Sequence, residues 1–202
     1  MYSDHILTIV NPASTSDLVT LASVKTELNI SGSAEDTELG TLIARASAAV
    51  QTFCNRIFGV ETLTELIRPA RSMAKVRLSR APVTTLTSVK EDDITLAGTE
   101  YEVDPGAGLI YRLQSSCRAL WCAKKIEIAY LAGYATIPAD VQQATLSLIT
   151  NARAGAGRDG ALKAEEIPGV IRQEFWVGQI GDHGAFPPNV IALLEPYRRV
   201  VI

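Results

Sequence analysis

The stretch Ser33–Arg56, SAEDTELGTLIARASAAVQTFCNR, decides the fold. The apolar residues that recur in it at helical spacing are Leu39, Leu42, Ile43, Ala46, Val50, Phe53 and Cys54, and Ile57 extends the row. At a period of 3.6 residues they share one face, which predicts an amphipathic helix. Ser33 and Asp36 have the spacing of a capping-box-like pair, and acidic residues crowd the end of the helix where its dipole favours negative charge. The helix is a packing element without candidate catalytic residues.

A short helix is expected just before this stretch. Thr20 can cap it, the apolar residues Leu21, Val24 and Leu28 share one face, and Ser31-Gly32 ends it. Two helices joined by a short turn bury facing stripes. The sequence therefore predicts a helical hairpin over residues 18–57, preceded by an irregular N-terminal arm over residues 1–17.

A third helix is expected over residues 138–154, because proline fits the first helical position. One face carries Val141, Ala144, Leu148 and Ala152. Leu146 and Ile149 widen the apolar surface beyond that face. Two interpretations stay open here: a lateral contact with another subunit, or a helix buried on two sides of its own core. A last short helix follows Phe186-Pro187-Pro188, and Pro196 should stop or kink it.

Between the second and third helices the pattern changes to the alternation of β-strands. The expected strands are residues 62–67, 75–78, 87–90, 100–103, 109–113 and 124–130. Asp104-Pro105-Gly106-Ala107-Gly108 is a tight turn, which predicts a β-hairpin. Residues 58–132 are therefore expected to form an antiparallel β-unit inserted between helices. The predicted fold class is α+β: a small helical bundle with this insert.

Composition limits the functions that are possible. The chain has 202 residues, of which 47% are hydrophobic and 20% charged, with a formal net charge of −3. These values are typical of a folded domain. Tight binding to DNA needs a basic face, which this charge does not favour. No apolar run reaches the length of a membrane span, and no secretory signal is visible. Three cysteines without a pairing pattern favour synthesis in a reducing cytoplasm.

Each motif that could carry chemistry has a simpler interpretation. Gly155–Gly160 matches G-x-G-x-x-G but follows a helix, so a loop is favoured over a nucleotide site. His5 and His183 lack a triad pattern, and Cys117 and Cys122 lack a second pair of zinc ligands. We therefore expect no catalytic residue, no cofactor and no metal site.

The charged and aromatic residues are ambiguous in the same way. Glu91-Asp92-Asp93 could bind a hard cation but is more typical of a solvated turn. Lys124-Lys125 and Arg198-Arg199 are too few for nucleic-acid affinity. Trp121 and Trp176 could each anchor an interface or fill a core.

The order of several segments resembles a known protein family. The segments are LASVKTEL (21–28), LIARASAAV (42–50), Ala81-Pro82-Val83, YEVDP (101–105), GLIY (108–111), AYLAGY (129–134) and IPADVQQA (137–144). Together they are similar to head–tail connector (adaptor, or head completion) proteins of long-tailed bacteriophages and prophages. The resemblance covers residues 18–154, and more weakly Ile167-Pro168-Gly169 and Pro196–Arg199.

The resemblance implies a structural protein and no enzyme. Members form a ring of about twelve copies beneath the portal, with heterologous contacts between neighbours. They extend the DNA channel, join head to tail, and offer a platform to the next head-completion or tail-terminator protein. The resemblance also implies a virion protein that is made in the cytoplasm of the bacterial host. DNA would slide past it without specific binding, and no membrane would be involved. The alternative is a DNA-binding or DNA-end-sealing module; a small hydrolase or nuclease is a third possibility.

The resemblance also implies which residues make the contacts. The C-terminal segment would grip the portal, and the expected contact residues are Val190, Leu193, Leu194, Tyr197, Arg198, Arg199, Val200 and Ile202. The lateral contact, which the wide apolar surface of the third helix suggests, would use Leu146 and Ile149. The expected organisation is an arm (1–17), a helical hairpin (18–57), a β insert (58–132), a third core helix (133–154), and a Gly-rich loop with a partner-binding segment (155–202).

Overall fold

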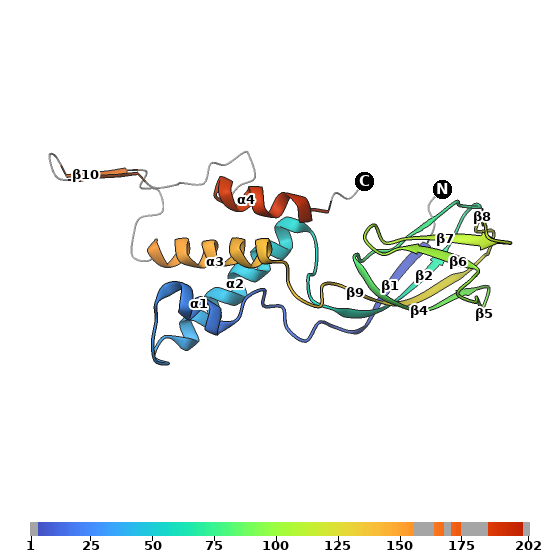
Figure 1. The fold of residues 1–202 in the computed structure, drawn as a ribbon, viewed down its shortest axis with the longest axis horizontal. Helices are drawn as coiled ribbons and strands as arrows, with labels where there is room; N and C mark the ends of the chain where they lie inside the picture. The colour runs from blue at the N-terminus through green and yellow to red at the C-terminus, as the bar shows by residue number, and fades with distance from the viewer. Residues whose placement is uncertain (1–3, 156–163, 168–170, 175–185, 200–202) are drawn as a thin grey trace. The chain divides into compact units, whose positions relative to one another are not determined.

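The chain folds into two compact units, each described here by itself (Figure 1). The computed structural model describes residues 4–155, 164–167, 171–174 and 186–199. The β-unit comprises Met1–Ser16 and Ile57–Ile137, and the helical unit comprises Asp17–Arg56 and Pro138–Ile202. The predicted α+β class is confirmed, and every strand pair that the structure describes is antiparallel.

The helical unit contains the predicted helices. Their bounds are α1 Leu21–Leu28, α2 Asp36–Cys54, α3 Ala139–Ala154 and α4 Pro188–Leu194, followed by the 3₁₀ turn η1 Glu195–Tyr197. The short strands β10 Ala164–Ile167 and β11 Ile171–Glu174 pair with each other. Among the described residues, no helix combines the length and the apolarity needed to cross a bilayer.

The helix starts follow local chemistry, with one correction. Thr20 caps α1 as predicted, because its side chain accepts a hydrogen bond from the Ser23 N–H at 3.1 Å. The prediction of a capping box formed by Ser33 and Asp36 was wrong. Helix α2 begins at Asp36, and its N-cap residue Glu35 makes no side-chain capping bond. Asp36 and Glu38 of the first turn still lie at the end of the helix where the dipole favours negative charge.

The core of the helical unit includes a polar residue on the apolar stripe. The buried residues of α2 are Leu39, Ile43, Ser47, Val50 and Cys54. Ser47 is fully buried, which is tolerated because its Oγ accepts a hydrogen bond from the Leu18 N–H at 3.0 Å. Leu39 and Ile43 share a cluster with Val24 of α1 and Ile149 of α3. The predicted packing of the first two helices is thus confirmed, and α3 packs against the same cluster.

The β-unit contains two antiparallel sheets. The first has the order β1-β2-β9-β4-β5, formed by Asp4–Asn11, Glu61–Arg68, Ile126–Ala132, Val83–Glu91 and Ile94–Thr95. The second has the order β3-β7-β6, with β8 also on β7, formed by Val76–Arg77, Leu109–Gln114, Tyr101–Asp104 and Cys117–Ala119. A single hydrophobic cluster draws side chains from both sheets, including Leu63, Ile128, Val76 and Ile110.

The alternation predicted for β2 and β9 is confirmed. Along β2 every second residue from Glu61 to Ile67 is buried, and β9 buries Ile126, Ile128 and Tyr130 on one face. The predicted β6–β7 hairpin also forms. Gly108 adopts a φ of +66°, and its N–H donates to the Asp104 carbonyl at 2.9 Å.

The prediction of an irregular N-terminal arm was wrong for most of its length. Asp4–Asn11 forms β1, which pairs with β2 from Asp4↔Arg68 onward. Apolar residues occur on both faces of this strand, so it lacks the clean alternation of a half-buried strand. Strand β4 likewise begins earlier than expected, at Val83, and the short strands β5 and β8 were not predicted.

Candidate interaction surfaces

A buried carboxylate anchors β1 to its sheet. Glu65 of β2 is 0% exposed. Its Oε1 accepts hydrogen bonds from the Tyr130 hydroxyl and, at 2.7 Å, from the Ser79 N–H, while its Oε2 pairs with His5 Nε2 of β1. A buried carboxylate is tolerated where such donors replace water. Burial and the adjacent Glu65 carboxylate raise the pKa of Tyr130, so this hydroxyl stays protonated and remains a donor.

Ser79, His5 and Glu65 have the composition of a hydrolytic triad but not its geometry. Ser79 Oγ lies 3.2 Å from His5 Nε2, and the same Nε2 atom contacts Glu65. A triad uses both imidazole nitrogens, one facing the nucleophile and the other the orienting carboxylate. This cluster therefore acts as a structural clasp rather than as a proton relay.

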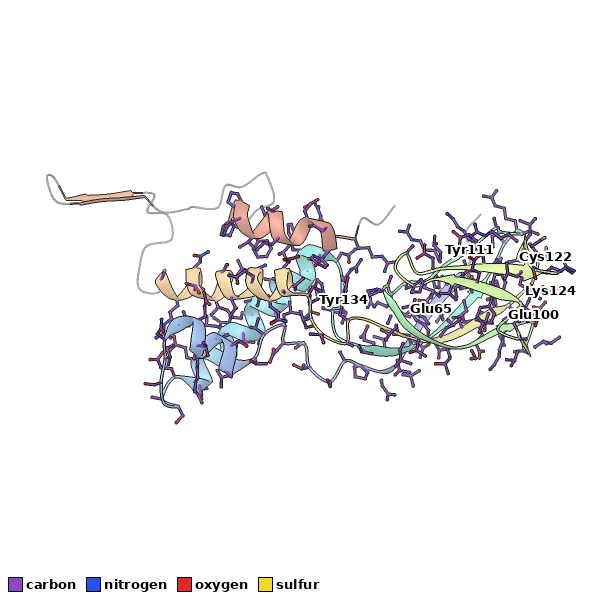
Figure 2. The ribbon with its side chains drawn as sticks, in the orientation of Figure 1. Glu65, Glu100, Tyr111, Cys122, Lys124 and Tyr134 are labelled. Carbon is purple, nitrogen blue, oxygen red and sulfur yellow. The ribbon has the colours of Figure 1, made fainter. Side chains whose placement is uncertain are left out.

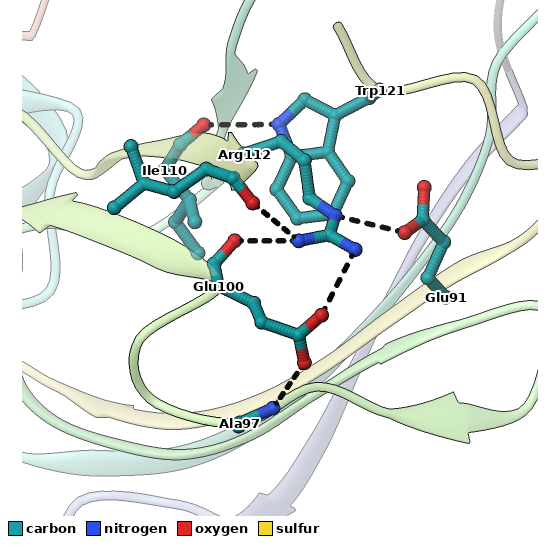
Figure 3. A network of polar contacts seen from close by, with 7 residues as sticks. Glu91, Ala97, Glu100, Ile110, Arg112 and Trp121 are labelled. Atoms are coloured by element: carbon teal, nitrogen blue, oxygen red, sulfur yellow. Dashed lines mark hydrogen bonds and ion pairs between the residues drawn. The ribbon is translucent and has the colours of Figure 1, made fainter. Parts of the chain in front are cut away.

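Arg112 of β7 is the centre of a second polar network (Figure 3). Its Nε donates to Glu91 Oε2 at 2.9 Å, and its Nη2 lies 3.4 Å from Glu100 Oε1. Its Nη1 donates to the carbonyls of Glu100 and Leu113 at 2.8 and 2.7 Å. The network borders a pocket of about 520 Å³. Because two carboxylates already neutralise the guanidinium, the pocket is poorly suited to an anionic ligand.

The described residues with large exposed apolar side chains all lie in the β-unit. They are Ile6 (50% exposed), Ile9 (46%), Val10 (54%), Ile94 (70%) and Leu120 (56%). The first three lie on β1 and Ile94 on β5, the two ends of the five-stranded sheet. Exposed apolar residues grouped on one edge strand are typical of an interaction site.

The three thiols differ in burial, which controls how readily a thiol reacts. Burial raises the pKa of Cys54 to about 11, whereas Cys117 and Cys122 are exposed. Figure 2 shows Cys122 with Glu100 and Lys124 at the end of the β-unit away from Tyr134. Since the thiolate is the nucleophile, we expect iodoacetamide at pH 8 to modify Cys117 and Cys122 and to spare Cys54. Intact mass should show two additions, and a third appearing only after denaturation; three additions to the folded chain would contradict this.

The structure divides the predicted portal-contact residues into two groups. Val190 and Leu194 are 0% exposed, so they belong to the core of the helical unit and offer no surface to a partner. The side chains that remain at least partly accessible are Leu193, Tyr197, Arg198 and Arg199. Arg198 lies over the Phe53 ring at 5.5 Å, and the Arg199 N–H donates to the Cys54 carbonyl at 2.9 Å. Val200 and Ile202 lie outside the described residues.

Of the two interpretations of α3, the structure favours a helix buried on two sides of its own core over a lateral contact with another subunit. Ile149 is 1% exposed and belongs to the cluster that contains Leu39 and Ile43. It therefore has no area left for a neighbouring subunit, and Leu146 is partly buried against the same cluster. The buried face of α3 also differs from the predicted one: Thr145 and Ile149 are buried in place of Leu148 and Ala152.

The other candidate motifs are structural where they are described. Asp92 Oδ1 accepts hydrogen bonds from the N–H groups of Lys124 and Lys125 at 3.0 and 2.9 Å, and Asp93 pairs with the Lys125 ammonium at 2.5 Å. These contacts fit the predicted turn. Within the described part of the chain, no group of three potential metal ligands comes together. Trp121 is fully buried. Trp176, His183 and most of Gly155–Gly160 lie outside the described residues.

Sequence reasoning missed both polar networks. His5 and Glu65 are 60 residues apart, and Glu91 and Arg112 are 21 apart. The one available signal was an acidic residue, Glu65, at an inward position of an alternating strand, which requires a buried donor.

The chain is similar to known proteins both in sequence and in fold. The sequence model of the head completion protein family matches residues 17–151. No curated protein matches the chain. Three solved structures are similar over 98% of this chain and 97% of theirs: the neck of an empty GTA particle computed with C6 symmetry (20% identity, TM-score 0.60), the neck of a native GTA particle computed with C12 symmetry (20%, 0.58), and the virion of a native gene transfer agent (GTA) particle (18%, 0.54).

The family match covers most of the chain and includes the main segments of the resemblance, from LASVKTEL (21–28) to IPADVQQA (137–144). The resemblance is therefore confirmed, together with the structural role in joining head to tail that it implied. The solved structures show that the fold is shared across nearly the whole chain. This protein belongs to the head completion protein family.

Proposed function

We propose that this chain is a non-enzymatic subunit of a ring beneath the portal, about twelve copies in number, that extends the DNA channel. The observation that carries the proposal is the likeness over nearly the whole chain to neck structures computed with C6 and C12 symmetry. A ring of identical chains needs heterologous contacts that close on themselves. The formal net charge of −3 suits a channel through which DNA slides without binding.

The proposed organisation follows from the chain order. The helical unit is made from two chain segments with β-unit residues between them, which supports a helical bundle with an inserted β-unit. We propose that residues 155–202 contain the partner-binding segment. Its portal contact would use Leu193, Tyr197, Arg198 and Arg199, together with Val200 and Ile202. The side of the ring that faces away from the portal would bind the next head-completion or tail-terminator protein. The virion would be assembled in the bacterial cytoplasm.

The portal contact can be tested by charge reversal. Arg198→Glu should weaken binding to the cognate portal protein at least tenfold, because arginine is frequent at the energetic centres of interfaces. The matched control is Arg118→Glu, on an arginine that is 61% exposed in the β-unit. Native mass spectrometry of the chain with its portal measures both. Equal binding by the two variants would contradict the C-terminal assignment, and no binding by the parent chain would contradict the proposed function.

The alternative, a DNA-binding or end-sealing module, makes a different prediction. It requires DNA affinity that falls steeply as salt rises. We expect no binding to duplex ends even at low salt, measured by fluorescence anisotropy. A clear salt-dependent slope would favour the alternative.

A further inference from the structure

The five-stranded sheet has one open edge, formed by β1. The structure describes a single strand partner for β1, namely β2. From Asp4 to Ile9 the pairing runs without a register shift, and this stretch contains neither lysine nor proline. Exposed edges in native sheets are usually blunted by such residues or by bulges. β1 therefore presents about six residues of regular backbone that can accept another strand.

The other end of the same sheet is blunted. β5 is two residues long, and β4 has register shifts between Val83 and Thr85 and between Leu86 and Ser88. Bulges and short strands prevent regular pairing. The contrast between the two ends indicates that the open edge is a feature of β1 and not of the sheet as a whole.

β1 is also held firmly in place. Leu7 packs against the hydrophobic cluster of the β-unit, and His5 is clasped by the buried Glu65. The other face of the strand carries Ile6, which is 50% exposed. A strand fixed on its inner side and apolar on its outer side is a preformed template for β-augmentation.

The chain also contains a β-hairpin for which the structure describes no third strand. β10 and β11 are four residues each and form a two-stranded sheet. Such a ribbon is marginally stable in water and needs a third strand or a packing surface. The eight residues 156–163 connect it to Gly155, the residue that follows α3, and the eleven residues 175–185 connect it to Phe186. Fully extended, these connections span about 26 and 36 Å, which gives the hairpin a long reach.

We propose that the β10–β11 hairpin of one copy adds to the β1 edge of the next copy. The inference rests on the proposed ring and deepens it by naming the lateral contact. Donor and acceptor are different parts of the chain, so each copy can give one hairpin and receive another. This is the heterologous arrangement that a closed ring needs. The backbone ladder provides the contact and the apolar residues of β1 cover it.

Cross-linking between variants that each carry one added, exposed cysteine tests the proposal. In a chain whose exposed Cys117 and Cys122 are replaced by serine, one variant carries Thr8→Cys on β1 and two others carry Glu165→Cys on β10 or Gln173→Cys on β11. Thr8→Cys is mixed with each hairpin variant and oxidised, both free at high concentration and bound to the portal. We expect a disulfide-linked heterodimer with one of the two hairpin variants, on non-reducing gels.

The controls separate the alternatives. Ile94→Cys, at the blunted end of the sheet, should give no heterodimer with either hairpin variant. The inference is overturned if Thr8→Cys links only to another Thr8→Cys chain, or if no heterodimer forms in either sample. It is also overturned if a further variant, with Thr8→Cys and a hairpin cysteine in one chain, forms a disulfide within that chain while the mixed variants form none. Portal binding is measured on the same samples, so a ring on the portal without a cross-link contradicts the hairpin contact and leaves the proposed function standing.

A second pair of variants gives an independent readout. Ile6→Lys places a charge on the open edge, and Ile94→Lys places the same charge on the blunted edge, where the isoleucine is 70% exposed. Both side chains are exposed, so both variants should keep the thermal midpoint of the parent. We expect the Ile6→Lys variant to reduce the yield of cross-linked heterodimer at least fivefold and the Ile94→Lys variant to leave it unchanged. Equal yields would contradict the role of β1.

Discussion

Replacing Glu65 with alanine is expected to lower the free energy of unfolding by about 3 kcal/mol or more. The substitution leaves the buried Tyr130 hydroxyl and the Ser79 N–H without their acceptor and opens a cavity in the β-unit core. It also releases His5, so β1 loses its clasp. The measurement is the midpoint of urea unfolding, followed by near-ultraviolet circular dichroism.

The matched control for this variant is Glu102→Ala. The Glu102 side chain is 53% exposed and pairs with an Arg118 side chain that is 61% exposed. Pairs of this kind contribute little, because water screens both charges. The control should change stability by less than about 0.5 kcal/mol. If the two variants unfold at the same urea concentration, Glu65 is not the anchor described above.

Gly133→Ala is expected to have an effect of similar size through backbone geometry. Gly133 has a φ of +125°, and a Cβ there would lie 2.2 Å from the Gly59 carbonyl oxygen and 2.6 Å from its carbon. Those atoms are backbone, so they cannot move aside as a side chain would. The strain and the forced separation should together lower stability by at least about 3 kcal/mol. Thermal unfolding measured by calorimetry gives the shift.

Gly98→Ala is the control for this backbone effect. No atom lies within 4 Å of a Cβ built at Gly98, and its φ is outside the left-handed region. The same glycine-to-alanine change there should leave stability unchanged or raise it by about 0.5 kcal/mol, since alanine restricts the unfolded chain. A Gly133→Ala chain that unfolds at the temperature of the Gly98→Ala chain would show that segment 57–60 can shift at low cost.

The helices could be predicted from sequence because their signals are local. Thr20 and the 3.6-residue period of α2 act within a few turns, and the structure has both. The hairpin at Asp104–Gly108 is also local. The sheet order was not predicted, because the β2–β9 partners are 59 to 71 residues apart, from Ile67↔Ile126 to Glu61↔Ala132, and local patterns do not encode such partners.

The interaction surfaces were less predictable than the fold. β1 was missed because Ile6, Leu7 and Ile9 place apolar residues on both faces, and the inward role of His5 depends on Glu65, which is distant in sequence. In the C-terminal region the apolar pattern identified a helix correctly. It could not distinguish Val190 and Leu194, which pack inward, from residues available to a partner.

The burial of Val190 and Leu194 has a consequence for how the C-terminal region would join an assembly. A segment that folds only on its partner spends part of its interaction energy on ordering itself. Because α4 is already packed within its own chain, docking there would carry little of that entropic cost. A contact of modest area could then hold the subunit in place for longer than an unstructured tail of the same length.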